Sequence, residues 1–68
     1  MNISKSIEPY FNYYKKKYPA IKDGEHEIII IPIKDGSRSL DNYFINPLKA
    51  NGYEYKENFL LSEIYMIK

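Results

Sequence analysis

His26 is the single histidine of this 68-residue chain, and it stands between two carboxylates, Glu25 and Glu27. Histidine is the side chain best suited to proton transfer near neutral pH, so this spacing would serve an acid–base pair or a metal chelate if the three side chains pointed the same way. The residues that follow have the composition of a strand, in which successive side chains point to opposite faces. His26 therefore faces away from both carboxylates, and we interpret it as a polar residue at the start of a strand.

Other forms of catalysis and metal binding lack their usual residues. The chain has no cysteine, which excludes disulfides and thiolate metal sites, and one histidine cannot build a zinc site of several imidazoles. No serine stands in a nucleophile-elbow pattern. The acidic candidates for hydrolysis share no motif: Asp41, Glu54, Glu57 and Glu63. A chain of this size also has little room for a pocket of about 300 Å3. We therefore expect no enzymatic activity, no cofactor and no metal.

The segment Lys34–Ser39 combines a glycine, two serines and Arg38, the one arginine of the chain. Between a strand and a helix, such a segment could hold a phosphate or a carboxylate on exposed backbone N–H groups. It lacks the spacing of a phosphate-binding loop, and a turn followed by a helix N-cap at Ser39 explains its residues without a ligand. We therefore predict a turn and a cap here.

The run Ile28–Ile31, with Ile33 after Pro32, is the strongest structural signal in the chain. Isoleucine is branched at Cβ and fits a pleated sheet, and the absence of polar alternation predicts a strand that is apolar on both faces. A chain this short buries only about 60% of the surface that it exposes when unfolded, so it has little material to cover both faces. We therefore expect an association surface on this strand. The candidate partner-binding residues are Tyr13, Ile29, Ile31, Ile33 and Arg38.

Two helices are expected from apolar spacing. Apolar residues recur three and four positions apart between Ser6 and Pro19, which predicts a first helix capped by Ser6 and stopped by the proline. A second helix is expected from about residue 40 to residue 45. Pro47 should interrupt it, because its ring clashes with the carbonyl four residues earlier, and a kink or a separate short turn should follow.

The last part of the chain favours strands. Residues 53–56 alternate and predict one strand, whereas residues 59–67 fit either a helix or a strand that pairs back on residues 53–56. Their β-branched and aromatic content favours the strand. As a strand it places on one face Leu60, Ile64 and Met66. The chain is thus interpreted as a single α+β domain over residues 1–68, in the order α-β-α-β-β, with two helices on a short antiparallel or mixed sheet.

Lysines and aromatic residues are interleaved in residues 10–18, a composition that also suits a site for single-stranded nucleic acid. The residues of this alternative are Lys15, Lys16, Lys17, Lys22 and Arg38. Lysines are favoured at the end of a helix in any case, and ten basic against nine acidic side chains leave a net charge of only +1. We therefore favour a protein partner over nucleic acid.

The choice among similar residues indicates a coding bias. The chain has eleven isoleucines and no valine, nine lysines and one arginine, and eight tyrosines, a combination that A- and T-rich codons produce. With the small size, this predicts a product of a phage or mobile element that inhibits a host protein by occupying its surface, as a homodimer or as a stoichiometric partner. No apolar run approaches the roughly 20 residues that span a bilayer, so we expect a cytoplasmic protein with no membrane partner.

Overall fold

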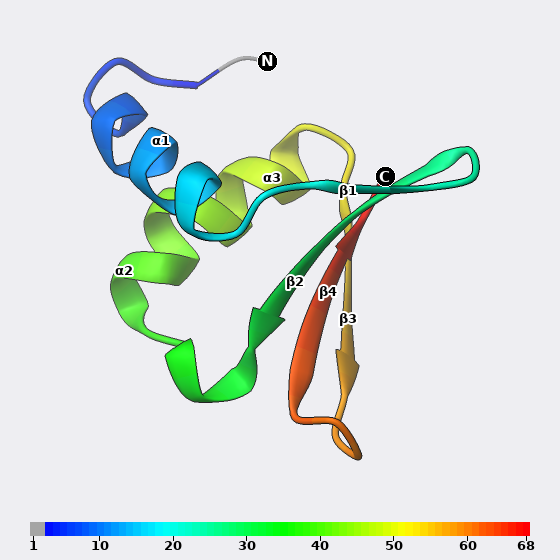
Figure 1. Cartoon of the computed structure of the whole chain (residues 1–68). Helices are drawn as coiled ribbons and strands as arrows, with labels where there is room; N and C mark the ends of the chain where they lie inside the picture. Colours follow the sequence, from blue (N-terminus) through cyan, green and yellow to red (C-terminus); the bar gives the residue numbers. More distant parts are fainter. Residues whose placement is uncertain (1–2) are drawn as a thin grey trace.

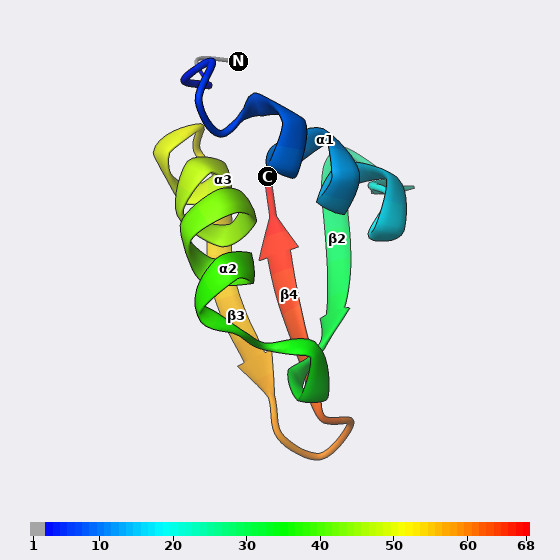
Figure 2. The same cartoon turned by 90° about the vertical axis from the view of Figure 1, so that its left-hand side faces the viewer.

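The computed structural model describes residues 3–68, which form a four-stranded antiparallel sheet with the helices on one face (Figure 1, Figure 2). Two helical regions are present: α1 (Glu8–Lys17) and a longer helix of three consecutive segments, α2 (Arg38–Leu40), η2 (Asp41–Ile45) and α3 (Asn46–Ala50). The strands are β1 (Ile21–Asp23), β2 (His26–Pro32), β3 (Glu54–Asn58) and β4 (Glu63–Ile67), and a 3-10 turn, η1 (Ile33–Asp35), follows β2. The predicted α+β class is confirmed.

Helix α1 follows the expected apolar spacing, with a different cap. Ile7 is the N-cap residue, and the N–H groups of Ile7 and Glu8 both bond to the carbonyl of Ser4, so the predicted capping by Ser6 is wrong. The last turn carries the lysine triplet, where positive charge is favoured by the helix dipole. Phe11 and Tyr18 are buried against the core, and the helix ends before Pro19 as predicted.

The second helical region, residues 38–50, is longer than the sequence predicts. The side chain of Ser37 caps it by accepting a hydrogen bond from the N–H of Leu40 at 3.0 Å, so Ser37 takes the role expected of Ser39. Pro47 does not end the helix, because the five residues of η2 widen into a π-helix in which the N–H of Asn46 bonds to the carbonyl of Asp41. This wider turn accommodates the proline ring, and the predicted interruption after residue 45 corresponds to the change from η2 to the short segment α3. We call residues 38–50 the α2–α3 helix.

The sheet has the spatial order β1-β2-β4-β3, with every neighbouring pair antiparallel. Residues 63–67 form a strand rather than a helix, as favoured above, and they pair with β3 and β2 on either side. Strand β1 was not expected. It is a three-residue strand that pairs with β2 across a turn at Gly24, whose φ of 63° suits glycine.

The core lies between the helices and the inner face of the sheet. Phe44 of η2 is fully buried at its centre, with the rings of Phe11, Tyr14 and Tyr18 at centroid distances of 5.4, 5.9 and 6.1 Å. The other fully buried side chains are Ile31, Leu40, Leu48 and Met66. The isoleucine strand thus directs Ile31 toward the helices and leaves its other face uncovered.

Candidate protein-binding surface

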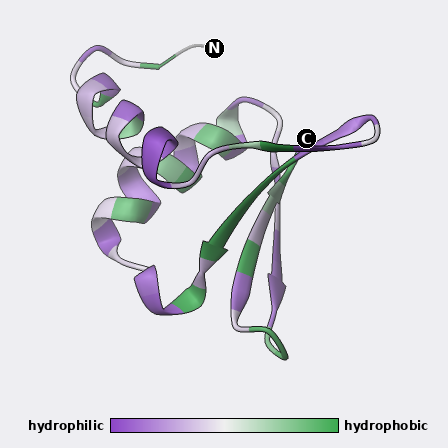
Figure 3. Ribbon diagram, viewed as in Figure 1, coloured by the Kyte–Doolittle hydropathy of each residue, from purple (hydrophilic) through white to green (hydrophobic). Residues whose placement is uncertain are grey.

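The turn that joins β3 to β4 exposes three consecutive apolar side chains. Phe59, Leu60 and Leu61 are 78%, 97% and 63% exposed, and we call these three residues the apolar tip. The tip lies at the lower end of the sheet in Figure 1 and is the green loop at the bottom of Figure 3. Leu60 was expected on the core face of a strand with Ile64 and Met66, which are buried, but residues 59–62 form a turn instead of the start of that strand, so Leu60 points away from the core.

Hydrogen bonds hold the apolar tip in one conformation. The Asn58 side-chain oxygen accepts from the N–H of Leu61 at 3.2 Å, and the N–H of Ser62 donates to the carbonyl of Phe59 at 3.3 Å. Ser62 has a left-handed φ of 54°, and its carbonyl accepts from the N–H of Ile33 at 2.9 Å, which ties the turn to the segment after β2. The apolar side chains are therefore presented on a defined turn rather than on a loose loop.

The outer face of the sheet is a second apolar surface. The strand register places Ile28 directly opposite Ile21 on one side and Ile67 on the other, and it places Ile30 opposite Tyr65. These five side chains form what we call the open face. No helix of the described residues covers it (Figure 1, Figure 2), and Ile21 is 52% exposed.

The structure separates the predicted partner-binding residues. Ile29 and Ile31 are 3% and 0% exposed, and Ile33 packs against the core, so these three face the helices rather than a partner. The outer face of the same strand carries Ile28 and Ile30 instead. Tyr13 is 61% exposed on α1, with its ring edge against Tyr14.

The basic residues of the nucleic-acid alternative are distributed over three elements. Lys15, Lys16 and Lys17 are exposed at the end of α1, where Lys17 Nζ lies 5.5 Å from the centroid of the Tyr18 ring. Lys22 of β1 has its Nζ 3.9 Å from a carboxylate oxygen of Glu27. Arg38 begins the α2–α3 helix. Two of these five side chains therefore interact within the fold.

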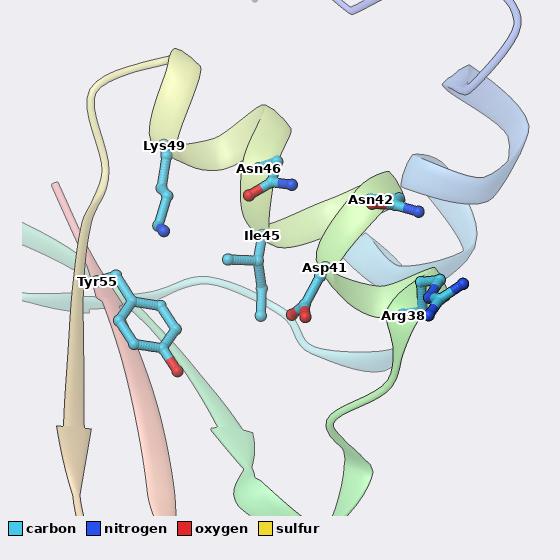
Figure 4. Close-up of a pocket in the computed structure, with 7 residues that line it drawn as sticks. All are labelled: Arg38, Asp41, Asn42, Ile45, Asn46, Lys49 and Tyr55. Carbon is cyan, nitrogen blue, oxygen red and sulfur yellow. The ribbon is translucent and has the colours of Figure 1, made fainter.

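A polar groove separates the α2–α3 helix from β3, and its volume is about 510 Å3 (Figure 4). The groove is larger than the pocket volume of about 300 Å3 for which so short a chain was expected to have little room, because it is an open surface groove rather than an enclosed cavity. The lining residues are Arg38, Asp41, Asn42, Ile45, Asn46, Lys49 and Tyr55. Tyr55 donates a hydrogen bond to Glu57 at 2.7 Å, and burial, followed by this bond, raises the pKa of the Tyr55 hydroxyl to about 12.

Tyrosine–carboxylate pairs account for part of the tyrosine content. The Tyr18 hydroxyl donates to Asp35 at 2.8 Å, and Tyr53 donates to Glu27. Burial, reinforced by these bonds, raises the pKa of each of the two hydroxyls to about 12. Both pairs join segments far apart in the chain, so these tyrosines stabilise the fold rather than provide contacts for a partner.

His26 lies exposed at the start of β2, opposite Asp23 of β1. Among residues 3–68 there is no cluster of three or more histidine, cysteine or acidic side chains that could hold a metal ion. In the same part of the chain no helix is long and apolar enough to cross a membrane. Comparison with known proteins finds no family model that matches the chain, and no match among curated proteins or solved structures.

Proposed function

We propose that this protein is a non-catalytic binding module that occupies the surface of a larger protein, with the apolar tip as its main anchor. The observation that carries the proposal is the exposure of Phe59, Leu60 and Leu61 at the end of a hydrogen-bonded turn. Contiguous exposed apolar side chains of this kind mark interaction sites in proteins that are otherwise well packed. The three residues of the tip could have been polar at no cost to the core.

The free energy gained by burying the side chains of the apolar tip is large enough for the tip to anchor a complex. Burying a Leu or Phe side chain that is otherwise exposed contributes about 1.5–3 kcal/mol, and about 1.4 kcal/mol corresponds to a tenfold change in affinity. The hydrogen bonds of Asn58 and Ser62 already order the turn, so little conformational entropy remains to be lost on binding. Three apolar residues that enter one pocket would therefore supply a large share of the affinity for a partner.

The residues that flank the tip favour a protein pocket. Glu57 and Glu63 stand near the two ends of the turn, and carboxylates are repelled by the anionic surface of a bilayer. An apolar pocket with a polar rim on a protein accepts both the tip and these carboxylates. The open face extends the apolar surface and suits either the same partner or a second copy of this chain.

The biological setting of the proposal rests on composition. The isoleucine, lysine and tyrosine bias and the length of 68 residues suit an inhibitor from a phage or mobile element that acts in the cytoplasm of its host. Such an inhibitor needs no chemistry of its own, because it acts by covering a surface that the host protein uses. The proposed mechanism is therefore steric occlusion.

The experiment that tests this function compares the protein with two variants in pull-downs from a host lysate, followed by affinity measurement with the captured protein. Leu60→Ser/Leu61→Ser removes two side chains of the tip, and Lys15→Ser/Lys16→Ser is the control, because it removes two exposed side chains from α1. The tip variant should lose about 100-fold in affinity while its melting curve stays close to that of the unmodified protein, and the control should bind normally. Equal binding by the tip variant and the unmodified protein would refute the proposal.

A further inference from the structure

The open face and the β3 strand beside it carry two rows of side chains that run across the sheet. The first row, read from β2 through β4 to β3, contains Ile28, Ile67 and Glu54. The second row, read in the same direction, contains Ile30, Tyr65 and Lys56. Each row is therefore apolar on the two central strands and ends on β3 in a charged residue, and the two charges have opposite signs.

Glu54 and Lys56 both project from the outer side of β3. The Nζ atom of Lys56 lies 3.9 Å from a carboxylate oxygen of Glu54, whereas Tyr55 between them turns inward to the polar groove. The side chains of Glu54 and Lys56 remain 70% and 58% exposed, so both charged groups are accessible for a further contact. The β3 rim of the open face thus carries one negative and one positive charge, one at the end of each row.

This pattern is complementary to itself under a two-fold rotation. An axis that lies in the plane of the interface and runs across the strands, between the two rows, stacks two open faces and exchanges their rows. The apolar residues of one row then face those of the other row, for example Ile28 of one copy against Ile30 of the second. Glu54 of each copy faces Lys56 of the other, so both charges gain a partner of opposite sign.

The other two-fold axis that stacks two open faces, which runs along the strands, suits the face less well. It would place each row over the same row of the second copy, and Glu54 would then lie over Ile21 at the opposite edge of the sheet. A carboxylate over an isoleucine loses water without gaining a partner. The axis across the strands avoids this. It also leaves Asp23 and Glu63 beyond the two rows, on different strands, where neither meets a carboxylate of the second copy.

The size of the open face determines the strength of the contact. Strands about 4.8 Å apart, with a rise of about 3.3 Å per residue, give a four-stranded sheet of this length a flat face of roughly 300 Å2. Stable complexes bury about 800 Å2 on each partner, so two stacked faces would form a weak, reversible dimer rather than an obligate one. Two copies of one sheet also match in width and twist, as they do in sandwiches whose sheets pack face to face.

We propose that the open face is the interface of a two-fold symmetric, reversible dimer of this chain. The apolar residues of β2 and β4 form the centre of the interface, and the two contacts between Glu54 and Lys56 of different copies fix the direction of stacking. The same rotation directs the two apolar tips to opposite ends of the dimer, so each copy can still engage a partner. Dimer formation therefore does not depend on what the tip binds.

Sedimentation equilibrium of the full chain, from about 10 μM to 1 mM, tests the contact between copies. The unmodified protein should pass from monomer to dimer within this range. Glu54→Lys and Lys56→Glu, measured separately, should each weaken self-association about tenfold, because each places like charges opposite one another. An equimolar mixture of the two variants should associate about as tightly as the unmodified protein, since every rim charge of one variant then faces an opposite charge of the other.

Matched variants separate this interface from overall charge and from the tip. Glu8→Lys and Lys16→Glu make the same changes of net charge at exposed positions of α1, and Leu60→Ser/Leu61→Ser removes apolar side chains from the tip; all three should leave self-association unchanged. A protein that stays monomeric up to about 1 mM would overturn the proposal and leave the open face for a different partner. Equal behaviour of the rim variants and the α1 controls, a mixture that associates no better than its components, or a loss of association in the tip variant would also overturn it.

Discussion

Replacing Tyr18 by Phe should lower the free energy of unfolding by about 1–2 kcal/mol. The hydroxyl of Tyr18 donates to Asp35 at 2.8 Å and joins the end of α1 to η1, 17 residues later in the chain. A hydrogen bond to a charged group contributes about 1.5–3 kcal/mol, and this one is only partly buried, so we expect a value around the lower end of that range, between about 1 and 2 kcal/mol. Phe keeps the ring that packs 6.1 Å from Phe44, which isolates the contribution of the hydroxyl.

The pH dependence follows from the sign of the pKa shift. Folding raises the pKa of Tyr18 from its ordinary value of 10.0 to about 12, so folding favours the protonated hydroxyl. The stabilisation is fully present below pH 10 and is lost as the pH rises from 10 through 12. The difference in stability between the unmodified protein and Tyr18→Phe should therefore shrink across that window.

Thermal unfolding followed by circular dichroism provides the assay. At neutral pH, Tyr18→Phe should melt about 4–16 °C below the unmodified protein, since 1 kcal/mol corresponds to about 4–8 °C in a domain of this size. Tyr13→Phe is the control, because its ring is 61% exposed on the same helix. If Tyr18→Phe melted together with the control, or if the difference grew above pH 10, the assigned role of the hydrogen bond would be wrong.

Three further expectations concern the core, the lysines and the open face. Phe44→Ala should cost about 3–5 kcal/mol and leave little folded signal by circular dichroism, whereas Tyr13→Ala should stay within about 0.5 kcal/mol of the unmodified protein. Changing the lysines of residues 15–17 to Gln should leave affinity for the protein partner nearly intact, and salt-sensitive oligonucleotide binding that this change abolishes would instead favour the nucleic-acid alternative. Light scattering should show weak self-association that Ile30→Thr reduces; a monomer at every concentration would contradict it.

The isoleucine run shows how far the sequence alone could go. Its β-branched residues identify the strand, but both sets of alternating side chains are equally apolar, so nothing local distinguishes the buried face from the open one. Long-range packing decides which face of the strand is buried. Ile31 packs against the helices, whereas Ile30 lies on the open face opposite Tyr65. Strand β1 was missed for a related reason: three residues with two charges have no strand pattern, and pairing with β2 creates the strand.

The candidate site was harder to anticipate than the fold. Sequence analysis assumes that apolar residues are buried, and Leu60 satisfies that pattern while lying 97% exposed. The available signal was Asn58, a good turn residue directly before the apolar run, whose side chain bonds to the N–H of Leu61. Pro47 indicated an interruption after residue 45, but it did not indicate that this interruption is a π-helical turn, which depends on hydrogen bonds rather than on composition and lets the helical region continue past the proline.

The order of the strands has a consequence for how the chain reaches its native state. The β1–β2 and β3–β4 hairpins and the α2–α3 helix are local and can begin to form separately, but the central pairing of β2 with β4 joins Ile31 to Ile64 across much of the chain. Closing that long loop costs entropy before any apolar burial repays it, so this step should limit the folding rate. On the ribosome, the edge of the isoleucine strand that pairs with β4 would stay open until residues 63–67 had emerged, and an unpaired strand edge of this kind is a feature that chaperones protect.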